Sequence, residues 1–252
     1  MEFQRSGHSK PRLNAKAFAM ATVFPILLGV GGPARADVIE LSSWWGGNTW
    51  DANIVFNGTN YHNGANTSLS GAGGAGGFKT YDLTKDPQKL NAFESWCVDI
   101  FHDFYFPASG SDTLKTAATV FGLAKANDLG RLATNHFASV ASMTSTALNA
   151  AAFQLAIWEI VNEGAGNSYN LSSGNFKVTG TGASLAQTWL NELNAGPSAS
   201  AYAVNIWTVQ QGAAGWGPQD VAVFTSVPEP GTFGMLLASI GIIGLIRRRK
   251  RR

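Results

Sequence analysis

Residues 145–163 read STALNAAAFQLAIWEIVNE, and this stretch predicts the strongest helix in the chain. Gln154 falls near the middle of an otherwise apolar stripe on that helix, one turn from Trp158. A buried amide is costly unless it is paired, so the pattern alone favours a glutamine hydrogen-bonded to neighbouring backbone. Drawn at about 100° per residue, the stripe contains Ala147, Ala151, Gln154, Trp158 and Val161.

The segments around this helix predict a mixed α+β fold. Residues 37–107 read as short strands separated by Gly/Asn clusters such as Gly46-Gly47-Asn48 and Asn57-Gly58. We therefore expect a β-rich, barrel- or sandwich-like subdomain with an inserted helical block. Beyond residue 107, the expected elements are helices over 112–127, 131–143 and 181–193, with a break at Gly130, and strands over 201–224.

Residues 71–77 (GAGGAGG) contain a formal G-x-G-x-x-G pattern at Gly71, Gly73 and Gly76. Nucleotide-binding motifs of this kind need a preceding strand and a following helix, which the surrounding composition does not supply. We interpret this stretch as a flexible loop.

Cys97 is the only cysteine, so no disulfide forms within the chain. The segment 96–100 (WCVDI) alternates like a strand and flanks Cys97 with large apolar side chains, an environment in which a free cysteine usually acts as a small buried hydrophobe. A buried thiol beside a buried glutamine can also form an internal thioester, when sulfur attacks the amide carbonyl and ammonia leaves. Apolar walls would store that activated acyl group until a nucleophile arrives.

Two short motifs resemble the signatures of bacterial surface thioester domains, which are found on adhesins of Gram-positive bacteria. Trp96-Cys97-Val98-Asp99 matches the cysteine signature, and 154–158 (QLAIW) matches the glutamine signature, with Phe153 where that family usually has Thr. The resemblance implies an extracellular domain over 37–226 in which Cys97 and Gln154 form the bond.

Supporting roles near this pair are predicted from position in the sequence. Asp99, Glu159 and His102 are the nearby titratable candidates, and Asp99 is favoured as the orienting or proton-handling group because the thiolate is the attacking species. Trp158 is interpreted as the shield of the bond. No clustered metal-ligand spacing is present, so neither a metal nor a cofactor is expected.

The N-terminus has the three parts of a secretory signal peptide, predicted over 1–36. A basic segment precedes an apolar run over 17–32, which is followed by Ala34-Arg35-Ala36 as an A-x-A cleavage site. The mature chain is expected to begin at Asp37.

The C-terminus resembles the PEP-CTERM sorting signal, which an exosortase reads in Gram-negative bacteria that make exopolysaccharide. Residues 227–230 include Pro228, Glu229 and Pro230, an apolar segment follows over 231–246, and six cations close the chain over 247–252. The apolar segment is slightly shorter than the ~20 residues that cross a bilayer comfortably. The cations would stay on the cytoplasmic side, which places the body outside. The expected partners are therefore the export machinery, an exosortase and the membrane. An inner-membrane intermediate would precede the cell surface or extracellular matrix.

Removing both ends reverses the sign of the net charge. Residues 37–226 hold seven Lys or Arg against fourteen Asp or Glu, so the body carries about −7 although the whole chain has a formal charge of +2. Such a body offers no basic face for phosphates, which excludes nucleic acid as a partner.

Taken together, the sequence predicts an exported surface protein whose Cys97–Gln154 thioester attaches covalently to amines or hydroxyls of a surface protein or polysaccharide, in adhesion or biofilm. It would react once and is not an enzyme. One alternative is a non-covalent matrix or glycan-binding protein with an unreactive Cys97 and tryptophans lining sugar sites. A third is a cysteine hydrolase with Cys97 activated by His102 or His136.

Overall fold

A computed structural model of the chain describes residues 36–62, 73–103, 105–164, 168–193, 200–209 and 219–227. The expected signal peptide up to Arg35, with Ala34 of its cleavage site, lies outside the described residues. So do Pro228, Glu229 and Pro230 and the apolar segment 231–246. Within the described ranges, no helix combines the length and the apolar character needed to cross a membrane.

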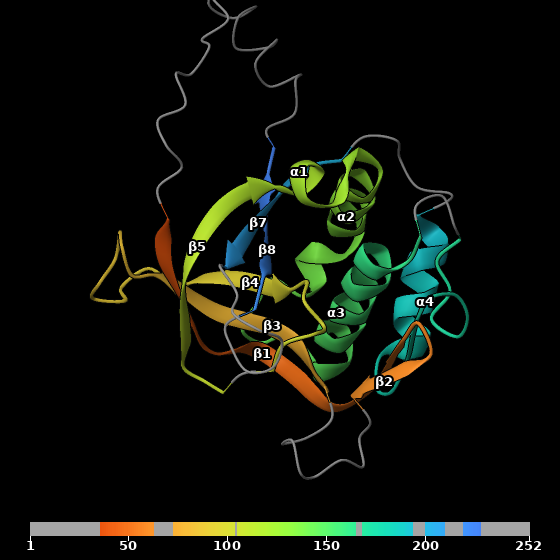
Figure 1. Cartoon of the computed structure of the whole chain (residues 1–252). Coiled ribbons are helices and arrows are strands. Elements are labelled where there is room, and N and C mark those ends of the chain that lie inside the picture. The colour runs from red at the N-terminus through yellow and green to blue at the C-terminus, as the bar shows by residue number, and fades with distance from the viewer. Residues whose placement is uncertain are drawn as a thin grey trace, which may run out of the picture. The chain divides into compact units, whose positions relative to one another are not determined.

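The described residues form a mixed α+β fold, as the sequence predicts (Figure 1). The helices are α1 (Ala117–Phe121), α2 (Leu123–His136), the short 3₁₀ helix η2 (Phe137–Ser139), α3 (Ala147–Asn162) and α4 (Ala183–Glu192). The strands are β1 (Asp37–Phe56), β2 (Thr59–His62), β3 (Gly73–Asp82), β4 (Phe93–Cys97), β5 (Ala108–Thr116), β6 (Phe176–Thr179), β7 (Tyr202–Val209) and β8 (Val221–Ser226).

The strands pair antiparallel in one sheet, in the order β2-β1-β3-β4-β8-β7-β5. β5 also pairs with the first residues of β1, so the ladder returns to the strand from which it started. β6 and β2 pair with the far end of β1, outside this ring. The strand order matters for the site because it places β4, the strand of Cys97, between β3 and β8.

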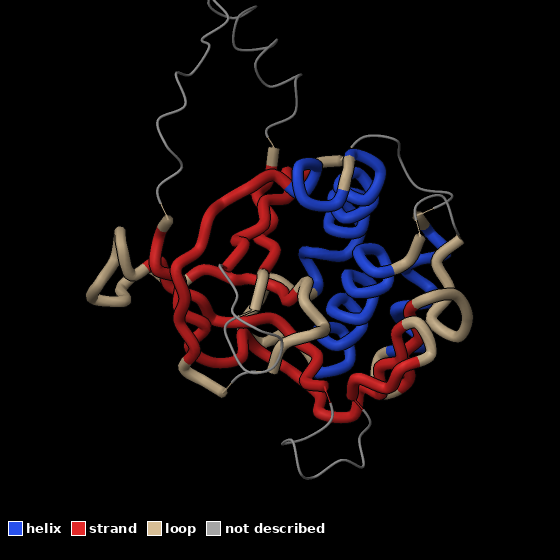
Figure 2. Tube along the Cα trace, in the orientation of Figure 1, coloured by secondary structure: helices blue, strands red, loops and turns tan. Residues whose placement is uncertain are grey.

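α3 lies against the sheet and is buried over almost its whole length. The helices gather on one side of the ring of strands, while β2 and β6 lie beside α4 (Figure 1 and Figure 2). The hydroxyl of Thr146 caps α3 by accepting a hydrogen bond from the Asn149 N–H at 3.2 Å. Every residue from Ala150 to Val161 is buried, which fits a helix that is apolar on all faces. Two of these positions, Gln154 and Glu159, are polar and therefore need an explanation.

β1 is one long strand, although the sequence predicts a turn at Gly46-Gly47-Asn48. The strand continues through these residues, where the register of its pairing with β3 shifts. Gly46 has a φ of 83° at this shift. The Gly47 N–H donates to the Ser145 carbonyl at 3.2 Å, and a Cβ at Gly47 would overlap the backbone of Ala147. The glycines therefore let the start of α3 approach the strand closely.

The prediction of a flexible loop at 71–77 is wrong for the part that the structure describes. Gly73–Gly77 belongs to β3. These residues are Gly or Ala, and the small side chains allow tryptophan rings to pack directly on the strand. A Cβ at Gly74 would overlap the indole of Trp44, and one at Gly77 would press on Trp96. These close contacts join residues that lie far apart in the sequence.

Two further predictions about the helices are wrong. Residues 112–116 belong to β5, not to a helix, because they pair with β7 and complete the ring. The helix break lies at Gly122, whereas α2 continues through Gly130. A Cβ at Gly130 would overlap the side chain of Ser200 and the carbonyl of Tyr202, so this glycine serves a close approach to the chain before β7.

Candidate functional site

β4 and α3 bring Cys97 and Gln154 together, although 57 positions separate them in the sequence. The Cys97 backbone N–H donates to Gln154 Oε1 at 3.1 Å, and Gln154 Nε2 donates to the Cys97 carbonyl at 2.7 Å. Both residues are buried. The side-chain amide is therefore held face to face with the backbone of the cysteine by two reciprocal hydrogen bonds.

The sulfur of Cys97 is held by the backbone of Asp99. Cys97 Sγ donates to the Asp99 carbonyl at 2.9 Å, and the Asp99 N–H points at Sγ from 3.3 Å. Burial raises the pKa of the Cys97 thiol above its ordinary value, and the charge of Asp99 adds to that rise. Hydrogen bonds from Asp99 and Trp158 act in the opposite direction on this pKa without reversing it. The thiol therefore stays protonated at neutral pH.

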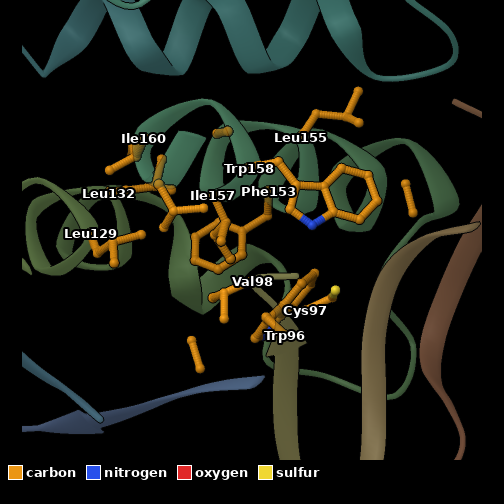
Figure 3. Close-up of a cluster of buried hydrophobic side chains, with 14 of the residues drawn as sticks. Trp96, Cys97, Val98, Leu129, Leu132, Phe153, Leu155, Ile157, Trp158 and Ile160 are labelled. Atoms are coloured by element: carbon orange, nitrogen blue, oxygen red, sulfur yellow. The ribbon is translucent and has the colours of Figure 1, made fainter. Parts of the chain in front are cut away.

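Trp158 covers this site from α3. In Figure 3 the nitrogen-bearing edge of the Trp158 indole faces Cys97. The indole is buried, and its N–H makes no hydrogen bond of ordinary geometry within the described ranges. The indole directs a hydrogen-bond donor toward the sulfur, and its role as a shield stays a prediction.

Phe153 belongs to the aromatic core rather than to the pair. Its ring packs edge-on against Trp96 at 4.8 Å between centroids, and it also contacts Phe137 and Phe224. Phe153 thus packs in the core at the position where bacterial surface thioester domains usually have the hydroxyl of a threonine.

Asp99 and His102 form a second pair beside the thiol. Asp99 Oδ2 lies 2.6 Å from His102 Nδ1, and Asp99 Oδ1 accepts the Phe101 N–H at 2.8 Å. The Gln219 side-chain amide donates to the His102 carbonyl, and the Val98 N–H donates to the Asp220 carbonyl at 3.0 Å. Residues 219–220, which precede β8, therefore help to fix the loop after Cys97. Sequence reasoning missed them because no local motif marks them.

Glu159 and His136 do not join this site. Glu159 Oε1 accepts the Asn170 N–H at 2.6 Å, so its carboxylate holds the segment before β6. His136 stacks on Trp189 at 4.3 Å and lies 2.9 Å from a carboxylate oxygen of Glu192. The part of the chain that the structure describes contains no group of three or more His, Cys, Asp or Glu side chains arranged to hold a metal ion.

Comparison with known families matches residues 226–252 to the PEP-CTERM protein-sorting motif. The motif supports a protein that is exported, sorted to the bacterial surface and processed by an exosortase. Comparisons with curated proteins and with solved structures gave no match.

Proposed function

We propose that the body of this exported protein carries an internal thioester between Cys97 Sγ and the side-chain carbonyl carbon of Gln154. The observation that carries this proposal is the pair of reciprocal hydrogen bonds, which fixes the Gln154 amide against Cys97 in a buried place. Bond formation joins sulfur to that carbon and breaks the carbon–nitrogen bond. The thiol proton leaves with the nitrogen as ammonia, so no cofactor is required.

The groups around Cys97 and Gln154 favour the formation of the thioester and its protection from water. As sulfur attacks, charge develops on Gln154 Oε1, which already accepts the Cys97 N–H, and a preorganised donor of this kind stabilises such charge. Because burial raises the pKa of the Cys97 thiol, the thiol keeps its proton until the sulfur attacks. The proton then passes to the Gln154 nitrogen, which must gain a proton to leave as ammonia. Trp158 and the apolar core then keep water from the product.

The bond would serve covalent attachment outside the cell. A nucleophile on a surface protein or a polysaccharide attacks the acyl carbon, the carbon–sulfur bond breaks, and the partner remains linked to Gln154 while Cys97 regains its thiol. Surface sorting through the C-terminal motif delivers this group to the place where adhesion or matrix assembly needs it. The event happens once per molecule, so we do not classify the protein as an enzyme.

A non-covalent matrix protein is the second candidate, and one observation favours it. Both polar atoms of the Gln154 amide are hydrogen-bonded to Cys97, which is how an unreactive buried glutamine is also satisfied. A cysteine hydrolase fits less well. His102 bonds to the Asp99 carboxylate rather than to the sulfur, and Cys97 is 1% exposed.

Intact mass of the full-length gene product, purified after export, tests the thioester. We expect a mass one ammonia below that of the processed sequence, and methylamine should add its own mass. Cys97→Ala and Gln154→Ala should each abolish both effects, because each removes one partner of the bond. A wild-type protein with full mass and no methylamine adduct would rule the thioester out.

A further inference from the structure

His102 is fixed in the loop after Cys97 by contacts of its ring and of its backbone carbonyl. Its ring nitrogen Nδ1 lies 2.6 Å from Asp99 Oδ2, and its carbonyl accepts the side chain of Gln219. The side chain is 13% exposed. The ring therefore has a defined orientation in a largely dry place.

The other ring nitrogen is an acceptor without a donor. In a neutral imidazole one nitrogen donates and the other accepts, and the carboxylate of Asp99 selects Nδ1 as the donor. Nε2 is then the basic nitrogen, and it has no hydrogen-bond partner among the residues that the structure describes. A buried acceptor left in this way costs free energy, so its presence needs a reason.

Asp99 links the imidazole to the sulfur. The backbone of Asp99 holds Cys97 Sγ through its carbonyl at 2.9 Å and its N–H at 3.3 Å, while its side chain holds His102. One residue thus sets the positions of the leaving sulfur and of a base. A carboxylate bonded to Nδ1 orients an imidazole so that its Nε2 can accept a proton, and Asp99 and His102 have this arrangement.

An exposed aromatic surface continues from the same loop. Phe101 contacts Tyr61 at 5.2 Å and Phe56 at 5.5 Å between ring centroids, and Phe101 and Tyr61 are each 41% exposed. We call Phe56, Tyr61 and Phe101 the Phe101 surface. Aromatic faces with a tyrosine hydroxyl suit the apolar faces and hydroxyls of sugar rings. The body carries about −7, which disfavours acidic sugars and leaves neutral ones.

We propose that His102 is the general base for a hydroxyl nucleophile, and that the nucleophile belongs to a neutral polysaccharide held at the Phe101 surface. This inference rests on the proposed thioester. The hydroxyl proton passes to His102 Nε2 as its oxygen bonds to the Gln154 acyl carbon. The carbon–sulfur bond breaks, and the proton then passes to the Cys97 sulfur, which leaves an ester and a free thiol. A hydroxyl needs this help because it is a poor nucleophile at neutral pH, whereas a neutral amine does not.

The test compares two small nucleophiles on the full-length exported protein. Glycerol and methylamine are reacted separately between pH 6 and 9, and the adducts are counted by intact mass. We expect His102→Gln to slow the glycerol reaction by about 100-fold. The methylamine reaction, corrected for the fraction of neutral amine, should change by less than about threefold, since it needs no base. The ammonia deficit in the variant shows that it folds and forms the bond.

Each other outcome overturns the proposal in a distinct way. Equal slowing of both nucleophiles means that His102 is structural, and an unchanged glycerol rate means that it takes no part. The wild type alone supplies a second measurement. Its glycerol rate should exceed the rate expected from hydroxide attack alone, and a rate that simply follows hydroxide concentration contradicts the base. A wild type without the ammonia deficit overturns the thioester itself and the present inference with it.

The sugar-binding part is tested with maltoheptaose. Phe101→Ser should raise the maltoheptaose concentration that gives the half-maximal rate by about tenfold, as expected for the loss of an aromatic contact of 1 to 1.5 kcal/mol. The effect on maltoheptaose should exceed any effect on glycerol by about tenfold, because glycerol is too small to use the surface. Equal effects on both, or no effect on either, contradict docking at the Phe101 surface.

Discussion

The amide of Gln154 lies at the centre of α3, where an unpaired polar group would cost several kcal/mol. The Cys97 backbone supplies both of its partners, one donor and one acceptor. The motifs around Cys97 and Gln154 identify the two residues from sequence, although β4 ends at Cys97 rather than continuing to residue 100, and α3 is buried on all faces rather than along one stripe. Their meeting depends on how β4 and α3 pack.

Trp158 allows two functions to be separated at a single position. Trp158→Phe keeps an apolar cover but removes the N–H that faces the sulfur. We expect the proposed thioester still to form, while its reaction with methylamine slows about fivefold, because the leaving sulfur loses a donor worth about 1 kcal/mol. Trp158→Ala should instead shorten the lifetime of the bond in water, since it opens the site.

Mass spectrometry of both variants over time measures these opposite effects. Trp189→Phe is the matched control, because Trp189 is a buried tryptophan on α4 that stacks on His136 instead. If Trp158→Phe reacts as fast as the wild type, the N–H has no role at the sulfur.

Glu159 is a buried carboxyl whose second oxygen lacks a hydrogen-bond partner among the described residues. Burial raises its pKa to about 7 from an ordinary value of 4.5. The folded state therefore keeps the proton longer than the unfolded state, and the stability present at acid pH is lost as pH rises through about 7. Glu159→Gln should raise the free energy of unfolding by about 1–2 kcal/mol at pH 8 and change it little at pH 4.5.

Urea unfolding at the two pH values measures this difference. The glutamine keeps the acceptor for the Asn170 N–H, so the comparison isolates the charge. Equal stability of wild type and variant at pH 8 would show that the carboxylate is solvated in the folded protein.

At the scale of elements, the contact between β1 and α3 decides how the helix begins. Thr146 and Asn149 form a recognisable cap in the sequence, but the strand that receives this end lies about one hundred residues earlier. Gly46 and Gly47 read locally as a turn. In the fold they form a strand irregularity that makes room for residues 145–147.

Gly47→Ala tests that contact. The added methyl would overlap the backbone N of Ala147, which cannot rotate away as a side chain can. We expect a loss of about 3 kcal/mol in the free energy of unfolding, typical of severe overpacking. Gly58→Ala is the control. Its Cβ meets nothing within 4 Å, so only the cost of its φ of 78° remains, about 1–2 kcal/mol. Equal losses would mean that β1 can shift away from α3.

At the scale of the whole molecule, the sorting tail follows directly on the body. β8 ends at Ser226, and the matched motif begins at residue 226. β8 also pairs with β4, where Val221 lies opposite Cys97. Processing of the tail must therefore occur beyond β8 if the site is to stay intact.

Glu229→Ala tests the tail in the exporting host. We expect the unprocessed chain to accumulate in the inner membrane, at least about tenfold over wild type, because the acidic centre of the Pro-Glu-Pro motif is lost. Fractionation and immunoblotting measure the distribution, with Thr232→Ser as a conservative control in the same tail. Normal surface delivery of Glu229→Ala would show that this residue is not needed for sorting.

The sequence by itself determined the features that depend on neighbouring residues. These are the mixed α+β class, the buried helix over 147–162, the hairpin turn at Asn57-Gly58, and the sorting motif at the C-terminus. Periodicity, capping and turn chemistry act within a few residues, so one chain is enough to read them.

Only the tertiary structure decided the features that join distant segments. Gly73–Gly77 became a strand because Trp44 and Trp96 cover it, and 112–116 became a strand because these residues pair with β7. Likewise, residues 219–220 reach the loop after Cys97. Packing across the closed sheet overrides local propensity at such places, because the contacts that repay it lie far along the chain.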